Sequence, residues 1–394
     1  MKVSQVYNIV NSIQSQLFGE TAVAVTDTTG LRALGEQISA SNLYDKFVGA
    51  LVDRIGKTIV RTLDTKVEFP GLLRNEFEFG AMLAKINFDI PAADNNTAWD
   101  IADPGFTPDQ FDVTLPVTKV IYFKGTSTWR VRCTVPDEPL LNSAFISAQE
   151  MLAFINGITD SMEKSMIEKI NAVSLSAISA MIAEKADASS AAYINLLDIY
   201  NNLTTPAGTM TAEEALRSPE FLRWASAQID LIISYMDTPS VLYNEAFPDG
   251  TKVARRTTRD NMHIWLHSQF VQASKSFMEA DTFHKDLVSM PYYKEIKLFQ
   301  GSGTTPIPAA SSAMQINVKV ESGDEVQCDY VLGCFADREA IGIGKYQVKT
   351  ASDRNNIDGY TNYASMANIM HYIDLSESVC VIALADPVIT PPTP

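Results

Sequence analysis

Clusters of basic side chains are scarce in this sequence. Its 394 residues include 31 lysines and arginines against 47 aspartates and glutamates, which gives a formal net charge of −16. A protein that grips nucleic acid through the phosphates needs clustered lysine and arginine, and the longest such run is "ARRTTR" at 254–259. The composition therefore argues against sequence-specific reading of DNA and predicts a surface that does not adhere to polyanions.

Long apolar runs and a secretion signal are also missing. The first residues, "MKVSQVYNIVNSI", lack a basic start followed by an unbroken apolar stretch, and no segment approaches the ~20 consecutive apolar residues that span a bilayer. We therefore expect no membrane partner. The cysteines are scattered without CxxC spacing, which predicts buried, reduced thiols in a cytoplasmic setting: Cys133, Cys328, Cys334 and Cys380.

Catalytic and metal-binding patterns are lacking as well. Of the 4 histidines, His263 and His267 are four residues apart, but the segment lacks the Glu of HExxH and has the pattern of a strand, so we interpret both as structural. "GIGKYQ" and "FGAMLAKI" lack the upstream glycine of a phosphate loop, and no helix pattern follows "GSGTTP". With no nucleophile elbow either, the sequence predicts no enzyme, no cofactor and no metal site.

The residues that are present predict a folded chain of two or three compact units. Hydrophobic residues make up 46% and charged residues 20% of the sequence, as in proteins with a true core. Near the N-terminus, "QVYNIVNSIQSQLFG" and "NLYDKFVGALVDRIG" have helical periodicity, and a stretch rich in Thr, Gly and Ser joins them. Such short helices need a surface to pack against.

Residues 62–137 have β patterns. "WRVRCTV" alternates between an apolar and a polar face, "VTKVIYFKG" before it is a second strand, and the "GTST" between them predicts a hairpin. Further upstream, "FEFGAMLAKINFDIP" precedes a turn-rich, proline-bearing stretch. The region as a whole predicts a long hairpin with a polar tip.

A long helix is predicted next. Ser147 and Glu150 have the spacing of a capping box, and apolar residues then recur every three or four positions to about residue 185. Such a helix is about 57 Å long, although Gly157 could bend it.

The second half of the chain mixes helices and strands. We expect helices in "AAYINLLDIYNNL" and "PEFLRWASAQIDLIISYM", and a strand in "MHIWLHSQF" that leads into the helix "FVQASKSFM". Further strands are expected in "YKEIKLFQG", "MQINVKV", "DYVLGCFADREAIGIG" and "SVCVIALADP", with a polar stretch between the last two. The proline-rich "VITPPTP" is expected to fray.

This order of elements resembles the major capsid proteins of tailed bacteriophages, which have the Hong Kong 97-type fold, and is most similar to the short-tailed phages of the phi twenty-nine type. The resemblance is carried by "FVGALVDRIGKTIVR", "STWRVRCTVPDEPLLNSAF", "RDNMHIWLHSQF" and the long segment from "YVLGCFADREAIGIG" to "SVCVIAL". In that segment an Asp-Arg step (Asp337, Arg338) is followed by aromatic-bearing strands. The resemblance covers most of the chain.

The resemblance implies an α+β fold whose parts fall at defined places in the sequence. These are an N-terminal arm (1–61), an extended β-hairpin or E-loop (62–137), a peripheral domain with a spine helix (138–200), an axial domain (201–329), the returning strands of the peripheral domain (330–386) and a tail (387–394). No immunoglobulin-like domain follows the last strand, so decoration would come from other proteins.

The resemblance also implies self-assembly into pentamers and hexamers of an icosahedral or prolate shell around the phage dsDNA genome. The implied partners are copies of the chain, a scaffolding protein, a portal, and decoration or head-fibre proteins, with assembly in the host cytoplasm. The apolar stripe in 47–55 is expected to pack against neighbouring subunits or the subunit's own peripheral domain. The residues expected at subunit interfaces are Phe47, Leu51, Asp53, Arg54, Ile55, Trp99, Lys119, Lys124, Trp129, Arg130 and Arg132.

Two further features follow from the resemblance. A chain that fits rings of five and of six needs hinges, for which Gly56, Gly80, Gly125 and Gly157 are candidates. Some relatives join subunits through a Lys–Asn isopeptide bond. Candidate lysines and asparagines are present, but we expect solvated lysines and no crosslink; the candidates are Lys85, Lys119, Lys124, Asn355, Asn356, Asn362 and Asn368.

Two alternative functions remain open from the sequence. An encapsulin compartment has the same fold but stores enzymes in a cell, and neighbouring genes for a portal and a terminase would distinguish the two. A soluble acidic enzyme that uses the carboxylates of "FADREA" lacks visible catalytic partners.

Overall fold

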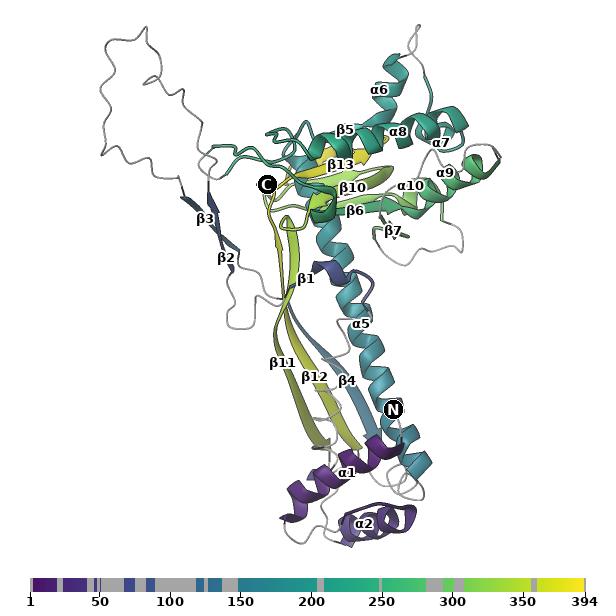
Figure 1. Ribbon diagram of the computed structural model, residues 1–394, viewed down its shortest axis with the longest axis vertical. Coiled ribbons are helices and arrows are strands. Elements are labelled where there is room, and N and C mark those ends of the chain that lie inside the picture. Colours follow the sequence, from purple (N-terminus) through teal and green to yellow (C-terminus); the bar gives the residue numbers. More distant parts are fainter. Residues whose placement is uncertain are drawn as a thin grey trace, which may run out of the picture. The chain divides into compact units, whose positions relative to one another are not determined.

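The computed structural model describes the chain in segments. These are residues 3–19, 24–40, 46–47, 50, 67–74, 83–88, 118–123, 127–136, 148–203, 209–247, 250–280, 293–300, 308–355 and 360–392. They form two compact units (Figure 1). Unit 1 comprises Met1–Ala81, Gly125–Ser174 and Ile343–His371, and unit 2 comprises Met82–Lys124, Leu175–Gly342 and Tyr372–Pro394.

Unit 1 contains the N-terminal helices and a four-stranded sheet. Helix α1 (Val3–Phe18) and helix α2 (Thr28–Ala40) bury Val10, Ile13, Leu31 and Ile38 completely. The Asn11 side chain fixes the chain between them, because it donates to Val25 O at 2.9 Å and accepts from Val25 N at 2.6 Å. Helix α1 was predicted. Helix α2 lies in the stretch that was expected to be only a connection, so that expectation was wrong.

The sheet of unit 1 has the strand order β1-β11-β12-β4. A short 3-10 turn (Pro70–Leu72) leads into β1 (Leu73–Arg74), which runs parallel to β11 (Ile341–Asn355). Strand β12 (Tyr360–Ile373) pairs antiparallel with β4 (Ser127–Pro136) over ten residue pairs. The aromatic-bearing strand expected from the resemblance is present as β12. The polar stretch expected before it consists largely of strand β11, whose many polar residues conceal a strand pattern.

Helix α5 (Ala148–Asp187) is the predicted long helix, and its residues are divided between the two units. It continues without interruption through Gly157. Met166 and Ile170 are buried, as the periodicity predicted, and from Ala177 onward almost every side chain is at least partly covered. The capping residue Ser147 lies outside the described residues.

Unit 2 is built on a five-stranded sheet in the order β5-β13-β10-β6-β7 (Figure 1). Its strands are β5 (Tyr193–Asn195), β13 (Val379–Ala383), β10 (Val331–Asp337), β6 (Met262–His267) and β7 (Lys294–Ile296). Its helices are α6 (Leu196–Leu203), α7 (Ala212–Ala215), α8 (Pro219–Met236), α9 (Ser268–Ala280) and α10 (Ala310–Ala313), and a 3-10 turn (Arg259–Asn261) precedes β6.

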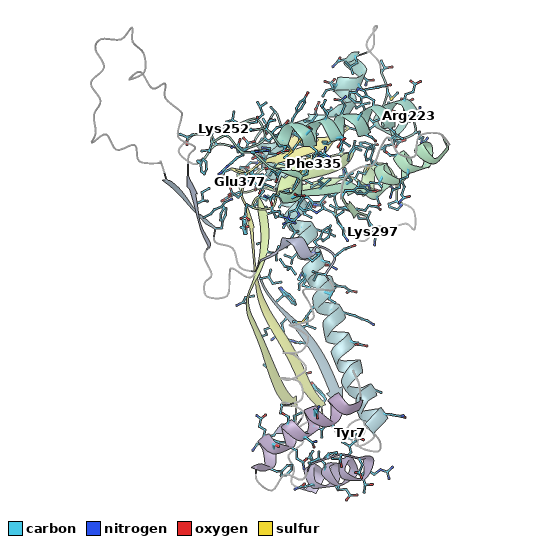
Figure 2. All side chains as sticks on the ribbon, viewed as in Figure 1. Tyr7, Arg223, Lys252, Lys297, Phe335 and Glu377 are labelled. Atoms are coloured by element: carbon cyan, nitrogen blue, oxygen red, sulfur yellow. The ribbon has the colours of Figure 1, made fainter. Side chains whose placement is uncertain are left out.

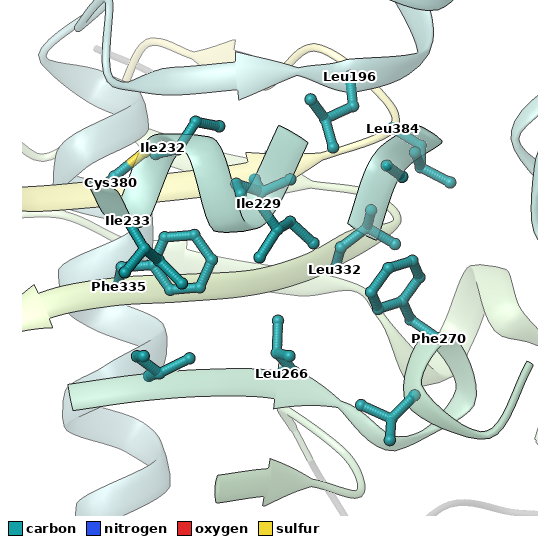
Figure 3. Close-up of a cluster of buried hydrophobic side chains, with 14 of the residues drawn as sticks. Leu196, Ile229, Ile232, Ile233, Leu266, Phe270, Leu332, Phe335, Cys380 and Leu384 are labelled. Carbon is teal, nitrogen blue, oxygen red and sulfur yellow. The ribbon is translucent and has the colours of Figure 1, made fainter. Parts of the chain in front are cut away.

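The core of unit 2 lies between this sheet and its helices. Figure 3 shows side chains of α8, such as Ile229 and Ile233, meeting Phe335 and Leu332 of β10. Phe335 and Cys380 are completely buried on adjacent strands, and Figure 2 shows Phe335 well inside the unit. The step from β6 directly into α9 was predicted. The helix expected over 191–203 is correct only from Leu196, since Tyr193–Asn195 form a strand parallel to β13.

Two smaller sheets complete unit 2. Strands β8 (Ile316–Lys319), β9 (Glu325–Cys328) and β14 (Val388–Thr390) form one sheet, in which β14 pairs antiparallel with β9. The tail was expected to fray, and for Val388–Thr390 this was wrong. The other sheet is the hairpin of β2 (Leu83–Phe88) and β3 (Thr118–Phe123).

The β2–β3 pairing confirms a hairpin within 62–137, whose predicted polar tip lies outside the described residues. A second prediction was wrong. The "GTST" segment was expected to close a hairpin between β3 and β4, but β4 pairs with β12. Turn chemistry alone does not decide strand pairing, because the backbone edge of β4 can hydrogen-bond to any strand whose alternation matches its faces.

A matched pair of glycine substitutions tests the packing. A Cβ at Gly333 would lie 2.4 Å from Trp265 O and 2.7 Å from Leu266 Cδ2, whereas a Cβ at Gly157 meets nothing within 4 Å. We expect Gly333→Ala to lower the free energy of unfolding by about 1–3 kcal/mol through overpacking. Gly157→Ala should raise it by about 0.5–1 kcal/mol. Denaturant unfolding of the unassembled chain measures both, and equal effects would contradict the packing around β10.

The pH dependence of stability tests the burial of His267. This side chain is fully buried, its ring stacks on Phe299, and burial lowers its pKa from 6.5 to about 4. The unfolded chain therefore takes up the proton first as the pH falls. The contribution of neutral His267 to the free energy of unfolding is fully present above pH 6.5. It decreases by about 3 kcal/mol as the pH falls toward 4.

The control for this prediction is His267→Gln, which cannot titrate. The difference in unfolding free energy between the wild type and this variant should shrink as the pH falls from 6.5 to 4, when denaturant unfolding is measured at several pH values. A difference that stays constant over that range would show that His267 does not remain neutral in the folded chain.

Candidate assembly surfaces

The residues predicted at subunit interfaces fall partly inside the described part of the chain. Phe47, Lys119, Trp129, Arg130 and Arg132 are described. The others lie outside the described residues: Leu51, Asp53, Arg54, Ile55, Trp99 and Lys124. The structure does not bring the five described residues together into one site, because Lys119 belongs to unit 2 and the other four to unit 1.

Phe47 is covered by its own chain. Its side chain is completely buried, like those of Val10, Leu31 and Ile38 in the helices of the same unit. The apolar stripe that begins at Phe47 therefore starts on a side chain already packed in the single subunit. The remainder of the stripe lies outside the described residues.

Strand β4 has the predicted alternation. Trp129 and Val131 are half-buried, whereas Arg130, Arg132 and Thr134 are exposed. Trp129 lies opposite Ala367 of β12, and Thr134 donates a hydrogen bond from its hydroxyl to Asn362 Oδ1 at 2.7 Å. One face of β4 is thus partly covered by the protein, and the other face exposes Arg130 and Arg132.

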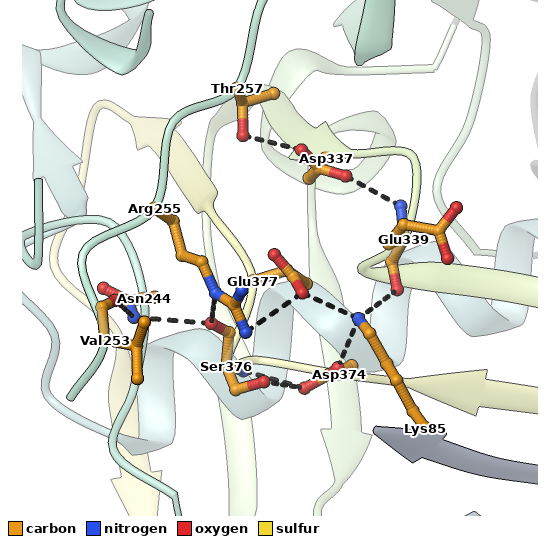
Figure 4. A network of polar contacts seen from close by, with 10 residues as sticks. All are labelled: Lys85, Asn244, Val253, Arg255, Thr257, Asp337, Glu339, Asp374, Ser376 and Glu377. Carbon is orange, nitrogen blue, oxygen red and sulfur yellow. Dashed lines mark hydrogen bonds and ion pairs between the residues drawn. The ribbon is translucent and has the colours of Figure 1, made fainter. Parts of the chain in front are cut away.

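The most elaborate polar arrangement lies where the β2–β3 hairpin meets the body of unit 2 (Figure 4). Lys85 Nζ lies 2.8 Å from Asp374 Oδ2 and 2.8 Å from Glu377 Oε1, and it also donates to Glu339 O at 3.5 Å. Asp374 is nearly fully buried. Lys85 was expected to be a solvated lysine, and this was wrong, because its side chain is only 16% exposed and is held by two carboxylates.

The acceptors of Lys85 belong to a turn that many hydrogen bonds fix in place. Asp374 Oδ1 accepts from both the backbone N–H and the hydroxyl of Ser376, and Asp374 N donates to Ala340 O at 2.7 Å. Asn244 Nδ2 donates to Ser376 O at 3.3 Å. The pattern "DLSES" at 374–378 has the Asp and Ser spacing of an Asx turn, which is the sequence signal that could have revealed it.

The basic run at 254–259 is used inside the chain. Arg255 pairs with Glu377 at 3.3 Å, Arg256 with Asp237 at 3.1 Å and Arg259 with Asp230 at 3.0 Å. In the same run, the Thr257 hydroxyl donates to Asp337 Oδ2 at 2.7 Å. Because each arginine already has a carboxylate partner, this run does not form a free phosphate-binding cluster. Figure 2 shows Glu377 and Lys252 at one end of unit 2 and Arg223 at the other.

Unit 2 also contains a buried lysine that forms an ion pair. Lys185 is completely buried, donates to Tyr243 O at 2.9 Å and pairs with Glu245. Burial lowers its pKa, and the neighbouring Glu245 opposes this shift. These contacts connect α5 with the segment at 243–245. That segment also contacts the 374–378 turn, because Glu245 N donates to Leu375 O. This lysine therefore serves the fold.

Large apolar side chains remain exposed on the single chain. Leu203 and Leu242 are each 63% exposed, and further members of this group lie on α8, β12 and β14. Exposed apolar surface of this kind marks contacts with other chains when it is grouped. The exposed side chains lie on several elements, with Met366 in unit 1 and the others in unit 2: Ile199, Leu203, Leu231, Tyr235, Val241, Leu242, Met366, Val388 and Ile389.

The histidines have structural surroundings. His263 stacks on Trp265 with ring centres 5.2 Å apart, and His267 stacks on Phe299 at 5.6 Å. Within the described segments, no group of three or more histidine, cysteine or carboxylate side chains could hold a metal ion. One stretch, Lys164–Asp187 of α5, is long and apolar enough to cross a bilayer, but half of its most apolar window is buried against the protein, as in a core helix.

Comparisons with known proteins give the family of the chain. The model of the Phi29-like phage major capsid protein family matches residues 8–383. A comparison with curated protein sequences gave no match.

Among solved structures, the capsid of Staphylococcus phage Andhra has a TM-score of 0.49 at 10% identity, covering 80% of this chain and 83% of that one. The capsid of cyanophage Pam1 has a TM-score of 0.42 at 11% identity, covering 81% and 93%. The mixed helix-and-strand architecture predicted from the sequence is confirmed by the elements of the structure. Because the family model matches residues 8–383, the chain belongs to the Phi29-like phage major capsid protein family, and it is a self-associating structural protein of the virion capsid, not an enzyme.

Proposed function

We propose that identical copies of this chain form pentamers and hexamers, which close into an icosahedral or prolate shell around the phage dsDNA genome. The observation that carries this proposal is the β2–β3 hairpin. Its strands pair with each other and, within the described residues, with no third strand. Lys85 and Phe123 hold the hairpin on unit 2, and the outer edges of its two strands are where a neighbouring copy would add its contacts.

The exposed apolar side chains support the same proposal. A single copy leaves Leu203 and Leu242 mostly in water, and burial in a shell would release about 25 cal/mol per Å² of apolar surface. Part of that gain offsets the loss of freedom on association. Shell formation of this kind needs no catalytic group.

The roles that we propose for the segments of the chain follow those of the family. Residues 1–61 act as an arm and 62–137 as the E-loop, which lies over an adjacent subunit. Residues 138–200 and 330–386 form the peripheral domain, 201–329 the axial domain, and 387–394 a tail. Contacts with neighbours involve the apolar stripe beyond Phe47 (51–55), Trp99, Lys119, Lys124 and the arginines of β4.

The proposed partners are a scaffolding protein during assembly in the host cytoplasm, a portal, and decoration or head-fibre proteins. Packaged DNA is held without reading of its sequence. The excess of carboxylates and the internal pairing of Arg255, Arg256 and Arg259 support this, because a carboxylate beside each arginine reduces the net positive charge that this run presents to phosphates. The family match favours a phage shell over an encapsulin compartment.

Truncation of the arm tests the proposal. We expect deletion of residues 1–45 to give soluble chain that forms no shells, because it removes helices α1 and α2 of the proposed arm. Circular dichroism checks that the rest remains folded, and electron microscopy of purified particles gives the result. Normal shells made by the truncated chain would count against a role of the arm in assembly.

Crosslinking gives a separate test. Lys85 is held in ion pairs with Asp374 and Glu377, and Asn362 accepts a hydrogen bond from Thr134. We therefore expect no Lys–Asn isopeptide bond, so a denaturing gel of mature particles should show one band near 43.3 kDa. A ladder of multiples would show that subunits are covalently joined.

A further inference from the structure

The β2–β3 hairpin is attached to unit 2 at two points on one of its faces. Phe123 of β3 lies opposite Leu83 of β2, two residues from Lys85, so Lys85 and Phe123 lie on the same face of the hairpin. The Phe123 ring lies 5.2 Å from the Tyr372 ring, while Lys85 reaches Asp374 and Glu377. One attachment would leave the hairpin free to pivot, whereas two attachments set its direction.

The receiving surface is rigid at both points. A Cβ on Gly342 would lie 2.4 Å from Tyr372 Cε1, so the glycine leaves the space that the Tyr372 ring occupies. The 374–377 turn is fixed by Asp374 N donating to Ala340 O and by Arg255 Nε donating to Ser376 O at 3.3 Å. Neither end of the contact relies on a freely rotating surface side chain.

Charge makes Lys85 the decisive member of this contact. Asp374 and Glu377 are both largely buried, and Glu377 also pairs with Arg255. With Lys85 and Arg255 present, two positive charges face two negative charges. Without Lys85, the nearly buried Asp374 loses an ion-pair partner, which is strongly unfavourable in poorly solvated surroundings.

We propose that Lys85 is a positioning residue for shell assembly, and that its contact with the turn at Asp374–Glu377 sets the direction in which the β2–β3 hairpin leaves the subunit. This rests on the proposed function of the hairpin as a contact with the adjacent copy. A hairpin held in place before assembly loses less conformational freedom when it meets its neighbour.

Spin-label distances in the unassembled full-length chain test the positioning directly. Labels at Thr118→Cys on β3 and Ser234→Cys on α8 report on the hairpin relative to the core of unit 2, in a Cys133→Ser background. Cys328, Cys334 and Cys380 are buried and remain unlabelled. We expect a narrow distance distribution in this labelled chain and a broad one after Lys85→Met. A narrow distribution after Lys85→Met would overturn the proposal.

Shell yield, measured by sedimentation and electron microscopy, tests the consequence for assembly. Lys85→Met should lower the yield by about tenfold or more, and Lys85→Arg should restore most of it. The matched control is Lys275→Met, which removes a lysine paired with Glu295 at 3.1 Å on an exposed face of α9. It should assemble normally, and an equal loss there would show that charge alone matters.

A double variant separates positioning from stability. Lys85→Met with Asp374→Asn removes both charges, so the melting temperature should recover toward that of the wild type while the distance distribution stays broad and the yield stays low. Recovery of the yield together with the melting temperature would reduce Lys85 to a stabilising residue and overturn the proposal.

Replacement of residues 90–116 by a short Gly-Ser turn tests the underlying function of the hairpin. Normal shells from this variant would refute the proposed hairpin contact itself. Loss of shells from this variant, with normal shells from Lys85→Met, would refute only the role of Lys85.

Discussion

The described structure depends on the pairing of a small number of basic side chains with a larger number of carboxylates. Lys85, Lys185 and Arg255 each neutralise an acid that is at least partly buried, and each connects segments that are distant in the sequence. An unpaired carboxylate in such a place would be costly. The small number of basic side chains also bears on the function, because an arginine that stabilises the fold, such as Arg255, is not available to DNA phosphates.

The parts of the fold that the sequence predicted are those with a strong local period. Helix α5, the step from β6 into α9 and the alternation of β4 follow from the spacing of apolar residues over six or more positions. The predictions that were wrong concern which strands pair with each other and segments whose hydrophobic pattern is weak. Strand β4 pairs with β12 and not with β3. Strand β11 is largely polar, and β14 lies next to prolines. In each case the strand is determined by its pairing with a distant segment, which the local residue pattern does not predict.

The candidate site was less predictable than the fold. Lys85 contacts residues 289 and 292 positions away in the chain, and no spacing rule connects them. The run at 254–259 was noticed only as a possible phosphate site, whereas its arginines pair with Asp237, Asp230 and Glu377. Only the Asp and Ser spacing of the turn at 374–378 was legible in the sequence, and it indicates a turn without indicating what binds there.

The place of that turn in the fold explains why it suits a mechanical role. It joins the end of β12 to the start of β13, and β13 is paired within the five-stranded core sheet of unit 2. Directly after the turn, Ser378 O accepts from Asp337 N and Val379 N donates to Tyr243 O. A force on the hairpin at Lys85 is therefore carried into buried strands rather than into a surface loop. Because close-packed strands deform little, a contact at this turn can hold the direction of the hairpin while a neighbouring copy binds it.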